Sequence, residues 1–308
     1  MDPAALAAPW GGLAGPARLA AERENVVWDA MLPSGRRVAL RLHRAGYQSA
    51  AGIAAELAWC EALAARGFPC PRPVRTTGGA LTARHGGRDV SAVTWIEGAV
   101  PVSDLPPTPD LHRRIGALLG RLHAESDAAA GPAPCLRPAW SMGGLAGPDP
   151  LWGRWWENVA ASGAQVRALI AARDAARDWL RGFAAGGAAD IGPIHADAIG
   201  ENVLAAPDGA LTLIDFDDCG MGFRLYDPGV ALVPRWADAD LPALTRATAE
   251  GYAAARGLDP ATVETHLPRF TAIRALASAG WIVARAGPED PRHAYYLRRA
   301  LACAERAF

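Results

Sequence analysis

The feature that most constrains the fold of this chain is the segment 191–220, IGPIHADAIGENVLAAPDGALTLIDFDDCG. Asn202 follows Asp197 by five positions and precedes Asp215 by thirteen, and the APDG between them is typical of a hairpin turn. The pattern predicts a strand-loop-strand unit that carries His195 in its loop. These polar side chains can act together only in a fold that brings the loop and the acidic turn to one place.

The residue types and their register indicate phosphoryl transfer, because they match a kinase catalytic loop followed by a magnesium aspartate. Such chemistry needs a carboxylate beside the attacking hydroxyl and a metal that neutralises phosphate charge. Asp197 fits the first task, and Asn202 and Asp215 supply the oxygen ligands that Mg²⁺ prefers. Asp217 is a second carboxylate near the expected metal. The alternative is a polar loop and an acidic turn with no catalytic role.

Composition bounds the remaining possibilities. The chain has 308 residues, of which 51% are hydrophobic, so it can bury a large core as one two-lobed unit or as two domains. The net charge of −1 gives no electrostatic reason to expect nucleic acid or an anionic membrane as a partner. The sequence has no run of 18 apolar residues and no signal-peptide pattern, so we expect a cytoplasmic protein, either monomeric or homodimeric.

Two residue types restrict the chemistry further. The five cysteines are scattered without CxxC spacing, so we expect reduced thiols rather than disulfides or a zinc site; they are Cys60, Cys70, Cys135, Cys219 and Cys303. The sequence contains no lysine, and therefore any side chain that clamps phosphate through a fixed positive charge must be an arginine.

Residues 1–97 predict a strand-rich lobe. The first 20 residues are expected to form an arm or a short helix, and the alternation of ENVVWDAML and RVALRLHR about PSGR predicts a β-hairpin. A helix is expected over 49–66, and further strands over VRTT (74–77), ALTARH (80–85) and DVSAVTWIEG (89–98). The lobe should therefore be an antiparallel sheet with one helix.

Residues 98–308 predict a mostly helical lobe that carries the catalytic loop and the acceptor site. A Pro-rich connection leads into it, and a loop is expected over 131–150. Helices are expected over 111–122, 150–161, 163–184, 225–236, 241–256, 268–286 and 291–307. The order of the lobes predicts an α+β architecture with a nucleotide between them.

Several motifs together resemble one family. They are His195-Ala196-Asp197 with Asn202, IDFD at 214–217 and LYDP at 225–228, and, less specifically, LRLHR at 40–44 and TWIEG at 94–98. Over nearly its whole length the chain resembles the aminoglycoside phosphotransferase and choline kinase group, the small-molecule relatives of protein kinases. The resemblance implies a two-lobed protein-kinase-like fold with residues 1–97 as the nucleotide-binding lobe.

The resemblance also implies a role for each matched position. Asp197 would be the catalytic base or would orient the hydroxyl, and Asn202 and Asp215 would bind Mg²⁺. Asp227 would brace the catalytic loop by accepting hydrogen bonds, and His195 would hold that loop in place. The backbone of the inter-lobe segment would pair with adenine; this segment comprises Trp95, Ile96 and Glu97.

Two departures from the family pattern concern the nucleotide. Arg41 stands where kinases place a lysine, and we expect it to pair with Glu56 and contact phosphate, although a surface ion pair is the alternative reading. The loop expected to cover the phosphates, LAAERENVVW, lacks glycine and offers only Asn25 and backbone. ATP is the expected nucleotide, and GTP stays open.

The positions of several other side chains allow either a functional or a structural interpretation. Trp152, Trp155 and Trp156 have the spacing of one helical face, which indicates a core seam or an acceptor wall. His123 follows an apolar helical face and is interpreted as a packing residue. Acidic residues near the catalytic loop would suit a cationic acceptor or interact with magnesium and solvent; they are Glu201, Asp217 and Asp218.

The sequence therefore predicts an ATP- and Mg²⁺-dependent O-phosphotransferase for the hydroxyl of a small molecule. The family resemblance points to an amine-bearing acceptor such as an aminoglycoside-like antibiotic or an amino alcohol metabolite. One alternative is a Ser/Thr protein kinase of the stress response kinase A type. Another is a nucleotide-binding regulator that has lost catalysis. The acceptor, the nucleotide preference and the oligomeric state stay open.

Overall fold

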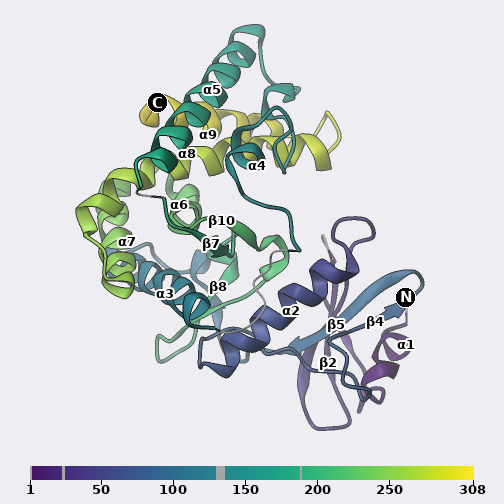
Figure 1. Ribbon diagram of the computed structural model, residues 1–308. Coiled ribbons are helices and arrows are strands. Elements are labelled where there is room, and N and C mark those ends of the chain that lie inside the picture. The colour runs from purple at the N-terminus through teal and green to yellow at the C-terminus, as the bar shows by residue number, and fades with distance from the viewer. Residues whose placement is uncertain (1, 23–24, 130–135, 188) are drawn as a thin grey trace.

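The computed structural model describes residues 2–22, 25–129, 136–187 and 189–308. Cys135 and the pair Arg23 and Glu24 of the expected phosphate loop lie outside the described residues. The chain forms a sheet lobe and a helical lobe, which lie at opposite ends of the molecule in Figure 1. The predicted two-lobed α+β architecture is confirmed, and in the described residues no helix has the length and apolar character of a transmembrane segment.

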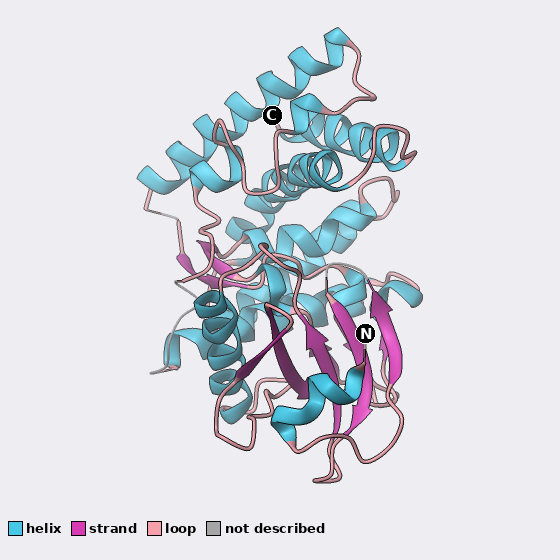
Figure 2. Ribbon diagram, turned by 90° about the vertical axis from the view of Figure 1, so that its right-hand side faces the viewer, coloured by secondary structure: helices cyan, strands magenta, loops and turns pink. Residues whose placement is uncertain are grey.

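The first lobe is built on a five-stranded antiparallel sheet with the order β1-β2-β3-β5-β4. Figure 2 shows this sheet beside the short N-terminal helix. The hairpin predicted about PSGR is confirmed, as is the helix predicted over 49–66. The elements of the lobe are α1 (Pro3–Ala7), β1 (Arg18–Glu22), β2 (Val26–Met31), β3 (Arg37–Leu42), α2 (Ala50–Ala65), β4 (Thr82–His85) and β5 (Arg88–Thr94).

Alternation along β3 divides its side chains between the two faces of the sheet. Val38, Leu40 and Leu42 are fully buried in a cluster with residues of α1. Ala39 packs against the cluster that α2 forms on the other face. Arg41 shares the face of Ala39, so the two-residue period alone directs its side chain towards α2.

Two expectations for this lobe were wrong. VRTT forms no strand: only an isolated bridge joins Pro73 to Val93, and Thr76 accepts hydrogen bonds across a turn instead. The prolines before it lack an N–H for a ladder. Conversely, β1 pairs with β2 although an arm or a short helix was expected up to residue 20; the weakly hydrophobic sequence of β1 fits an edge strand.

The second lobe surrounds the catalytic segment with helices. β6 (Val100–Pro101), β8 (Val203–Ala205) and β9 (Leu211–Leu213) form one small sheet, and β7 (Ile191–Ile194) pairs with β10 (Gly220–Phe223). The helices are α3 (Pro109–Ala128), α4 (Met142–Ala146), α5 (Gly163–Ala185), α6 (Tyr226–Leu232), α7 (Leu241–Arg256), α8 (Pro260–Arg285) and α9 (Arg292–Ala307).

The prediction of a helix over 150–161 was wrong. Only a 3₁₀ turn, Trp155–Glu157, forms there, so the three tryptophans do not share one helical face. Gly153 has a φ of +95°, and its carbonyl oxygen lies 2.2 Å from the point where a Cβ on Gly280 would stand. The Gly153 N–H donates to the Pro150 carbonyl at 2.9 Å, so a tight turn rather than a helix lies against α8 here. A second difference is that α8 begins at Pro260, capped by Asp259, rather than near residue 268.

Helices α3 and α7 approach each other through glycine. A Cβ on Gly251 would stand 1.8 Å from the carbonyl oxygen of Arg113, and one on Gly116 would stand 2.1 Å from that of Thr248. Neither position has room for a methyl group, so the spacing of the two helices depends on both glycines.

We expect Gly251→Ala to lower the free energy of unfolding by about 3 kcal/mol or more, because backbone atoms must move to admit the methyl group. Gly182→Ala is the matched control, since nothing lies within 4 Å of its would-be Cβ on α5. There alanine should stabilise the helix by about 0.5 to 1 kcal/mol. Urea denaturation of both variants checks this, and an unchanged stability of Gly251→Ala would contradict the packing described.

Candidate active site

A buried carboxylate organises the catalytic loop. Asp227, at the start of α6, accepts hydrogen bonds from the backbone N–H of His195 at 2.8 Å and of Ala196 at 2.7 Å. Ala196 has a φ of +65°, a left-handed conformation that a non-glycine residue adopts only at a cost. The two hydrogen bonds hold the backbone in this turn and so direct the following Asp197.

The histidines around this carboxylate are neutral structural residues. The backbone N–H of Asp197 donates to His195 Nδ1 at 3.2 Å, so Nε2 is the nitrogen that donates to the Ile214 carbonyl at 2.9 Å. Burial lowers the pKa of His195. His123 joins Asp227 at 2.9 Å to the Tyr252 hydroxyl at 2.8 Å, and burial lowers its pKa as well. The interpretation of His123 as a packing residue is therefore consistent with its contacts.

Asp197 has both carboxylate oxygens engaged. The Asn202 side-chain amide donates to Oδ2 at 3.0 Å and to the Asp197 carbonyl at 2.8 Å. Oδ1 forms an ion pair with Arg274 of α8. Burial raises the pKa of Asp197 to about 8, although the Arg274 charge opposes this shift. The carboxyl group is thus a stronger base than an exposed aspartate, which is a property of many catalytic bases.

Asn202 and Asp215 are brought together by the second hairpin. The Ile214 N–H donates to the Asn202 carbonyl at 2.9 Å, and Val203 pairs with Leu213. Asp215 follows with a φ of +60°, and its side chain is 50% exposed. Because the Asn202 amide nitrogen donates to Asp197, its amide oxygen stays available as an acceptor.

The donor set fits a hard divalent cation. It offers one accessible carboxylate and one amide oxygen, and the described residues contain no cluster of three or more His, Cys, Asp or Glu that could hold a metal. Such a sparse set suits Mg²⁺, which binds through one or two carboxylates together with nucleotide phosphates and water.

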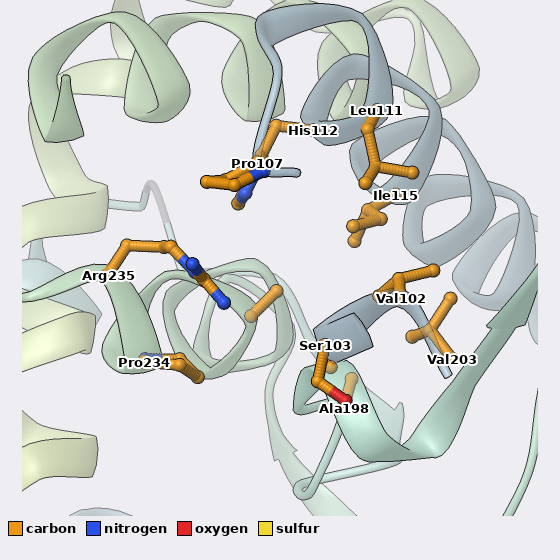
Figure 3. A pocket seen from close by; sticks show the side chains of 12 residues that line it. Val102, Ser103, Pro107, Leu111, His112, Ile115, Ala198, Val203, Pro234 and Arg235 are labelled. Carbon is orange, nitrogen blue, oxygen red and sulfur yellow. The ribbon is translucent and has the colours of Figure 1, made fainter. Parts of the chain in front are cut away.

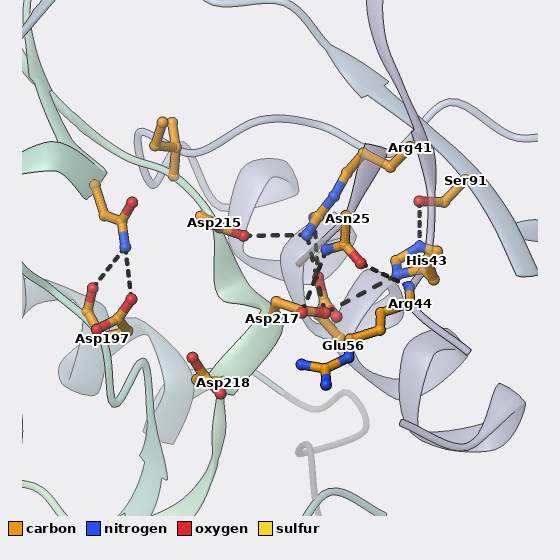
Figure 4. A network of polar contacts seen from close by, with 12 residues as sticks. Asn25, Arg41, His43, Arg44, Glu56, Ser91, Asp197, Asp215, Asp217 and Asp218 are labelled. Atoms are coloured by element: carbon orange, nitrogen blue, oxygen red, sulfur yellow. Dashed lines mark hydrogen bonds and ion pairs between the residues drawn. The ribbon is translucent and has the colours of Figure 1, made fainter. Parts of the chain in front are cut away.

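Arg41 connects the two lobes at this point. Its Nη1 lies 3.4 Å from Glu56 Oε1 on α2 and its Nη2 lies 3.0 Å from Asp215 Oδ1, as Figure 4 shows. The side chain is only 9% exposed, so the alternative of a surface ion pair was wrong. The expected pairing with Glu56 is confirmed. Burial raises the pKa of Glu56 to about 7, against the opposing charges of Arg137 and Arg41.

Asp217 lies inside this network rather than at its open side. It accepts a hydrogen bond from Asn25 at 3.3 Å and lies 3.7 Å from Arg137 Nη2. Arg137 Nη1 also lies 3.2 Å from Glu56 Oε2, so Arg137 and Asn25 tie the acidic turn to the sheet lobe. Its contacts make Asp217 a residue that supports the seam between the lobes.

On the other side of the catalytic loop, aromatic side chains contact Asp218. The Tyr47 hydroxyl donates to Asp218, and the Trp140 indole N–H donates to the Asp218 carbonyl at 2.8 Å. Burial, followed by the charge of Asp217, raises the pKa of Asp218 to about 6. Trp152 lies edge-to-face on Trp140 at a centroid distance of 5.3 Å, whereas Trp155 is fully buried in the core. Glu201 is exposed.

The inter-lobe segment follows β5. The Trp95 N–H donates to the Arg37 carbonyl at 3.0 Å, and Arg37 pairs with Glu97 at 3.1 Å. Among the described residues, the Ile96 and Glu97 backbone N–H groups have no hydrogen-bond acceptor. These groups are therefore available to a ligand between the lobes.

A small cavity behind the catalytic loop is a separate feature (Figure 3). Its volume of about 20 Å³ suits a single water molecule. Its walls include Ser103, His112, Ala198 and Arg235. None of the polar side chains around Asp197 lines it, so it is not the candidate active site.

Sequence reasoning missed several residues of this site. Arg137 lies in a Pro-rich stretch without any periodic pattern, and nothing in the sequence indicated its contacts. Arg274 did leave a signal, because it is a single charge within the apolar run TAIRALASAG at 271–280. Such a charge on a buried helix requires a partner.

Comparison with known proteins agrees with this geometry. Residues 17–266 match the family model of the phosphotransferase enzyme family. A homoserine kinase of Methylobacterium sp. (strain 4-46) is 31% identical over 245 residues, which cover 75% of this chain and 71% of that protein. A homoserine kinase of Acidiphilium cryptum (strain JF-5) is 32% identical over 268 residues, covering 79% and 77%.

Solved structures share the whole fold. A microcompartment-associated aminopropanol kinase superposes with a TM-score of 0.81 at 28% identity, covering 94% of this chain and 91% of that one. An amicoumacin kinase, solved with AMP-PNP and Ca²⁺, has the same fold with a TM-score of 0.73 at 17% identity, covering 94% and 88%. The chain is a kinase that phosphorylates hydroxyl groups, and it belongs to the phosphotransferase enzyme family.

Proposed function

We propose that the protein transfers the γ-phosphoryl group of ATP, with Mg²⁺, to the hydroxyl of a small amine-bearing molecule. The observation that carries the proposal is the meeting of Asp197, Asn202 and Asp215 with the buried Arg41–Glu56 pair at the seam of the lobes. Phosphoryl transfer depends chiefly on positioning and on electrostatic stabilisation, and these groups supply both.

In this mechanism Asp197 orients the acceptor hydroxyl and takes its proton. Its raised pKa suits that task, and Asn202 fixes its orientation through Oδ2. Asn202 and Asp215 would hold Mg²⁺, which neutralises charge on the phosphates when bound. Arg41 would contact phosphate, as a buried guanidinium held against Glu56 from behind. The backbone N–H groups of Ile96 and Glu97 would form hydrogen bonds with adenine, and Trp95 would lie beside the base. If the nucleotide is GTP, the same groups would face guanine.

The acceptor side supports a small molecule. Asp218 supplies a half-buried carboxylate for an ammonium group, and Tyr47 and Trp140 fix its position. The relatives named homoserine kinase and aminopropanol kinase act, by those names, on small hydroxylated amines. These similarities favour a small-molecule kinase over a protein kinase. Residues 1–97 would bind the nucleotide and residues 98–308 the acceptor.

We expect Asp197→Asn to reduce turnover by about a hundred- to ten-thousand-fold, because the amide cannot take the hydroxyl proton. Asp215→Ala should raise the Mg²⁺ concentration needed for half-maximal activity. ADP release is measured with amino alcohols, hydroxy amino acids, aminoglycosides and a generic protein substrate. Full activity of Asp197→Asn would refute the mechanism, and turnover with the protein substrate alone would favour the protein-kinase alternative. Absence of turnover in the wild type would favour the regulator that has lost catalysis.

Arg41 provides a second test, directed at the nucleotide. Arg41→Met should raise the KM for ATP about tenfold to a hundredfold, the loss expected for one charged hydrogen bond. Arg41→Lys should recover part of this loss, because it keeps the charge and loses the planar fork. Arg36→Lys, in the exposed turn before β3, is the control. An unchanged KM for ATP in Arg41→Met would remove Arg41 from the nucleotide site.

The crowding of carboxylates predicts an unusual pH dependence of stability. The pKa of Asp218 is raised from 3.8 to about 6, so the folded state holds its proton more tightly than the unfolded state. Stability is therefore lost as the pH rises from about 4 through about 6, and the cost of about 1 to 3 kcal/mol is fully present above that window.

Asp218→Asn removes this cost. In metal-free protein it should raise the free energy of unfolding by about 1 to 3 kcal/mol at about pH 8 and leave it unchanged at about pH 4. Asp178→Asn on the exposed face of α5 should change stability by less than about 0.5 kcal/mol at either pH. Equal effects of Asp218→Asn at both pH values would show that charge on this residue does not limit stability.

A further inference from the structure

Arg274 is a buried cation that the phosphoryl-transfer machinery does not explain. It lies on α8, is 5% exposed, and its guanidinium is 4.0 Å from the centre of the Trp152 ring. One nitrogen, Nη2, contacts Asp197 Oδ1. A guanidinium removed from water is costly unless its donors are satisfied, so the partners of the remaining nitrogens matter.

In the described part of the chain, two of the three nitrogens have no well-formed partner. Within the described residues, Arg274 Nε and Nη1 are buried without a well-formed hydrogen bond, and so is the Tyr226 hydroxyl. Burial raises the pKa of Tyr226, whereas the charge of Arg274 and a hydrogen bond from it lower that pKa, so the two side chains are neighbours although their hydrogen bond is poorly formed. Tyr226 stacks on Trp140 at 5.5 Å. Several unsatisfied donors therefore gather beside the catalytic aspartate.

Arg274 contacts Asp197 on the side away from the proposed nucleotide site. Asn202, a proposed metal ligand, donates to Oδ2, whereas Arg274 pairs with Oδ1. Arg41, the proposed phosphate contact, belongs to the network of the sheet lobe. Arg274 and Trp152 come from the helical lobe. The unsatisfied donors thus lie on the side of Asp197 where an acceptor must approach.

The charges of this region favour a bound anion. Arg299 of α9 is buried, and both burial and the Arg274 charge lower its pKa. Its guanidinium stacks on Tyr296 at 4.7 Å, and among the described residues its Nε is buried without a hydrogen-bond partner. Asp218 carries the opposite charge and lies close enough to Arg274 for that guanidinium to lower its pKa against the effect of burial. The region therefore carries positive charge on Arg274 and Arg299 and negative charge on Asp218.

We propose that Arg274 selects the acceptor: it binds a carboxylate on the small molecule whose hydroxyl faces Asp197. This inference rests on the proposed phosphotransferase function and narrows the acceptor class to hydroxy amino acids, with the ammonium group near Asp218. A carboxylate presents two oxygens to the planar guanidinium, and the Tyr226 hydroxyl can donate to it as well. When Arg274 pairs with the carboxylate of the acceptor, its ion pair with Asp197 Oδ1 breaks. That oxygen can then accept the proton of the hydroxyl group.

The test compares acceptors that differ only by the carboxylate. Homoserine is paired with propanolamine, and threonine with isopropanolamine, and kcat/KM is measured for each. The wild type should favour the carboxylate-bearing member of at least one pair by about tenfold to a hundredfold, the value of one charged hydrogen bond. Arg274→Gln should abolish this preference, and Arg274→Lys should keep part of it.

Arg269→Gln is the matched control, because Arg269 also lies on α8 and stacks on a tryptophan, Trp179, at 5.6 Å. It should leave the preference unchanged. A wild type that uses the amino alcohols as well as or better than the amino acids would overturn the inference. So would Arg274 variants that slow both members of a pair equally. If no acceptor of any class is phosphorylated, the proposed function itself fails, which is a distinguishable result.

Discussion

The geometry of the site depends on one buried carboxylate. Asp227 is fully buried and accepts hydrogen bonds from two successive backbone N–H groups and from His123. Each hydrogen bond to a charged group contributes about 1.5 to 3 kcal/mol, enough to hold Ala196 at a positive φ. Because that turn fixes where the next residue points, the position of Asp197, and with it that of Asn202, follows from Asp227. His123 of α3 and Tyr252 of α7, which extend the hydrogen bonding of Asp227, therefore act on the position of Asp197 from a distance.

The two lobes are joined at the site by charge as well as by apolar packing, because Trp59 of α2 also lies edge-to-face on Phe216 of the acidic turn. Arg41 and Arg137 both contact Glu56, and they reach Asp215 and Asp217 across the seam. In a chain without lysine each of these contacts uses a guanidinium, whose fixed fork can engage two carboxylates at once. The seam therefore couples the position of α2 to the acidic turn. Nucleotide and metal would compete with Arg41 for Asp215, which ties ligand binding to the arrangement of the lobes.

The acidic groups near the catalytic loop oppose folding in the absence of ligand. Burial raises the pKa values of Asp197, Asp218 and Glu56 to about 8, 6 and 7, respectively. Burying these carboxylates thus imposes an electrostatic cost on the fold. The ion pair with Arg274 offsets part of this cost for Asp197, while Arg274 Nε and Nη1 have no well-formed hydrogen bond within the described residues. The same crowding that costs stability makes Asp197 basic enough to take a proton.

The sequence by itself determined the order of the lobes, the hairpin of β2 and β3, and the catalytic segment, because alternation, turn chemistry and spacing are local properties. The resemblance to kinases also predicted the pairing of Arg41 with Glu56, and the two-residue period of β3 agrees with it. Only the tertiary structure decided which distant side chains complete the site. Arg137, Tyr47 and Arg274 come from a loop, a turn and a helix far apart in the chain, and their partners follow from packing. The tryptophans at 152–156 lie in or against the core, as one of their two interpretations expected, but the helix predicted for them does not form, because Gly153 closely approaches Gly280 of α8.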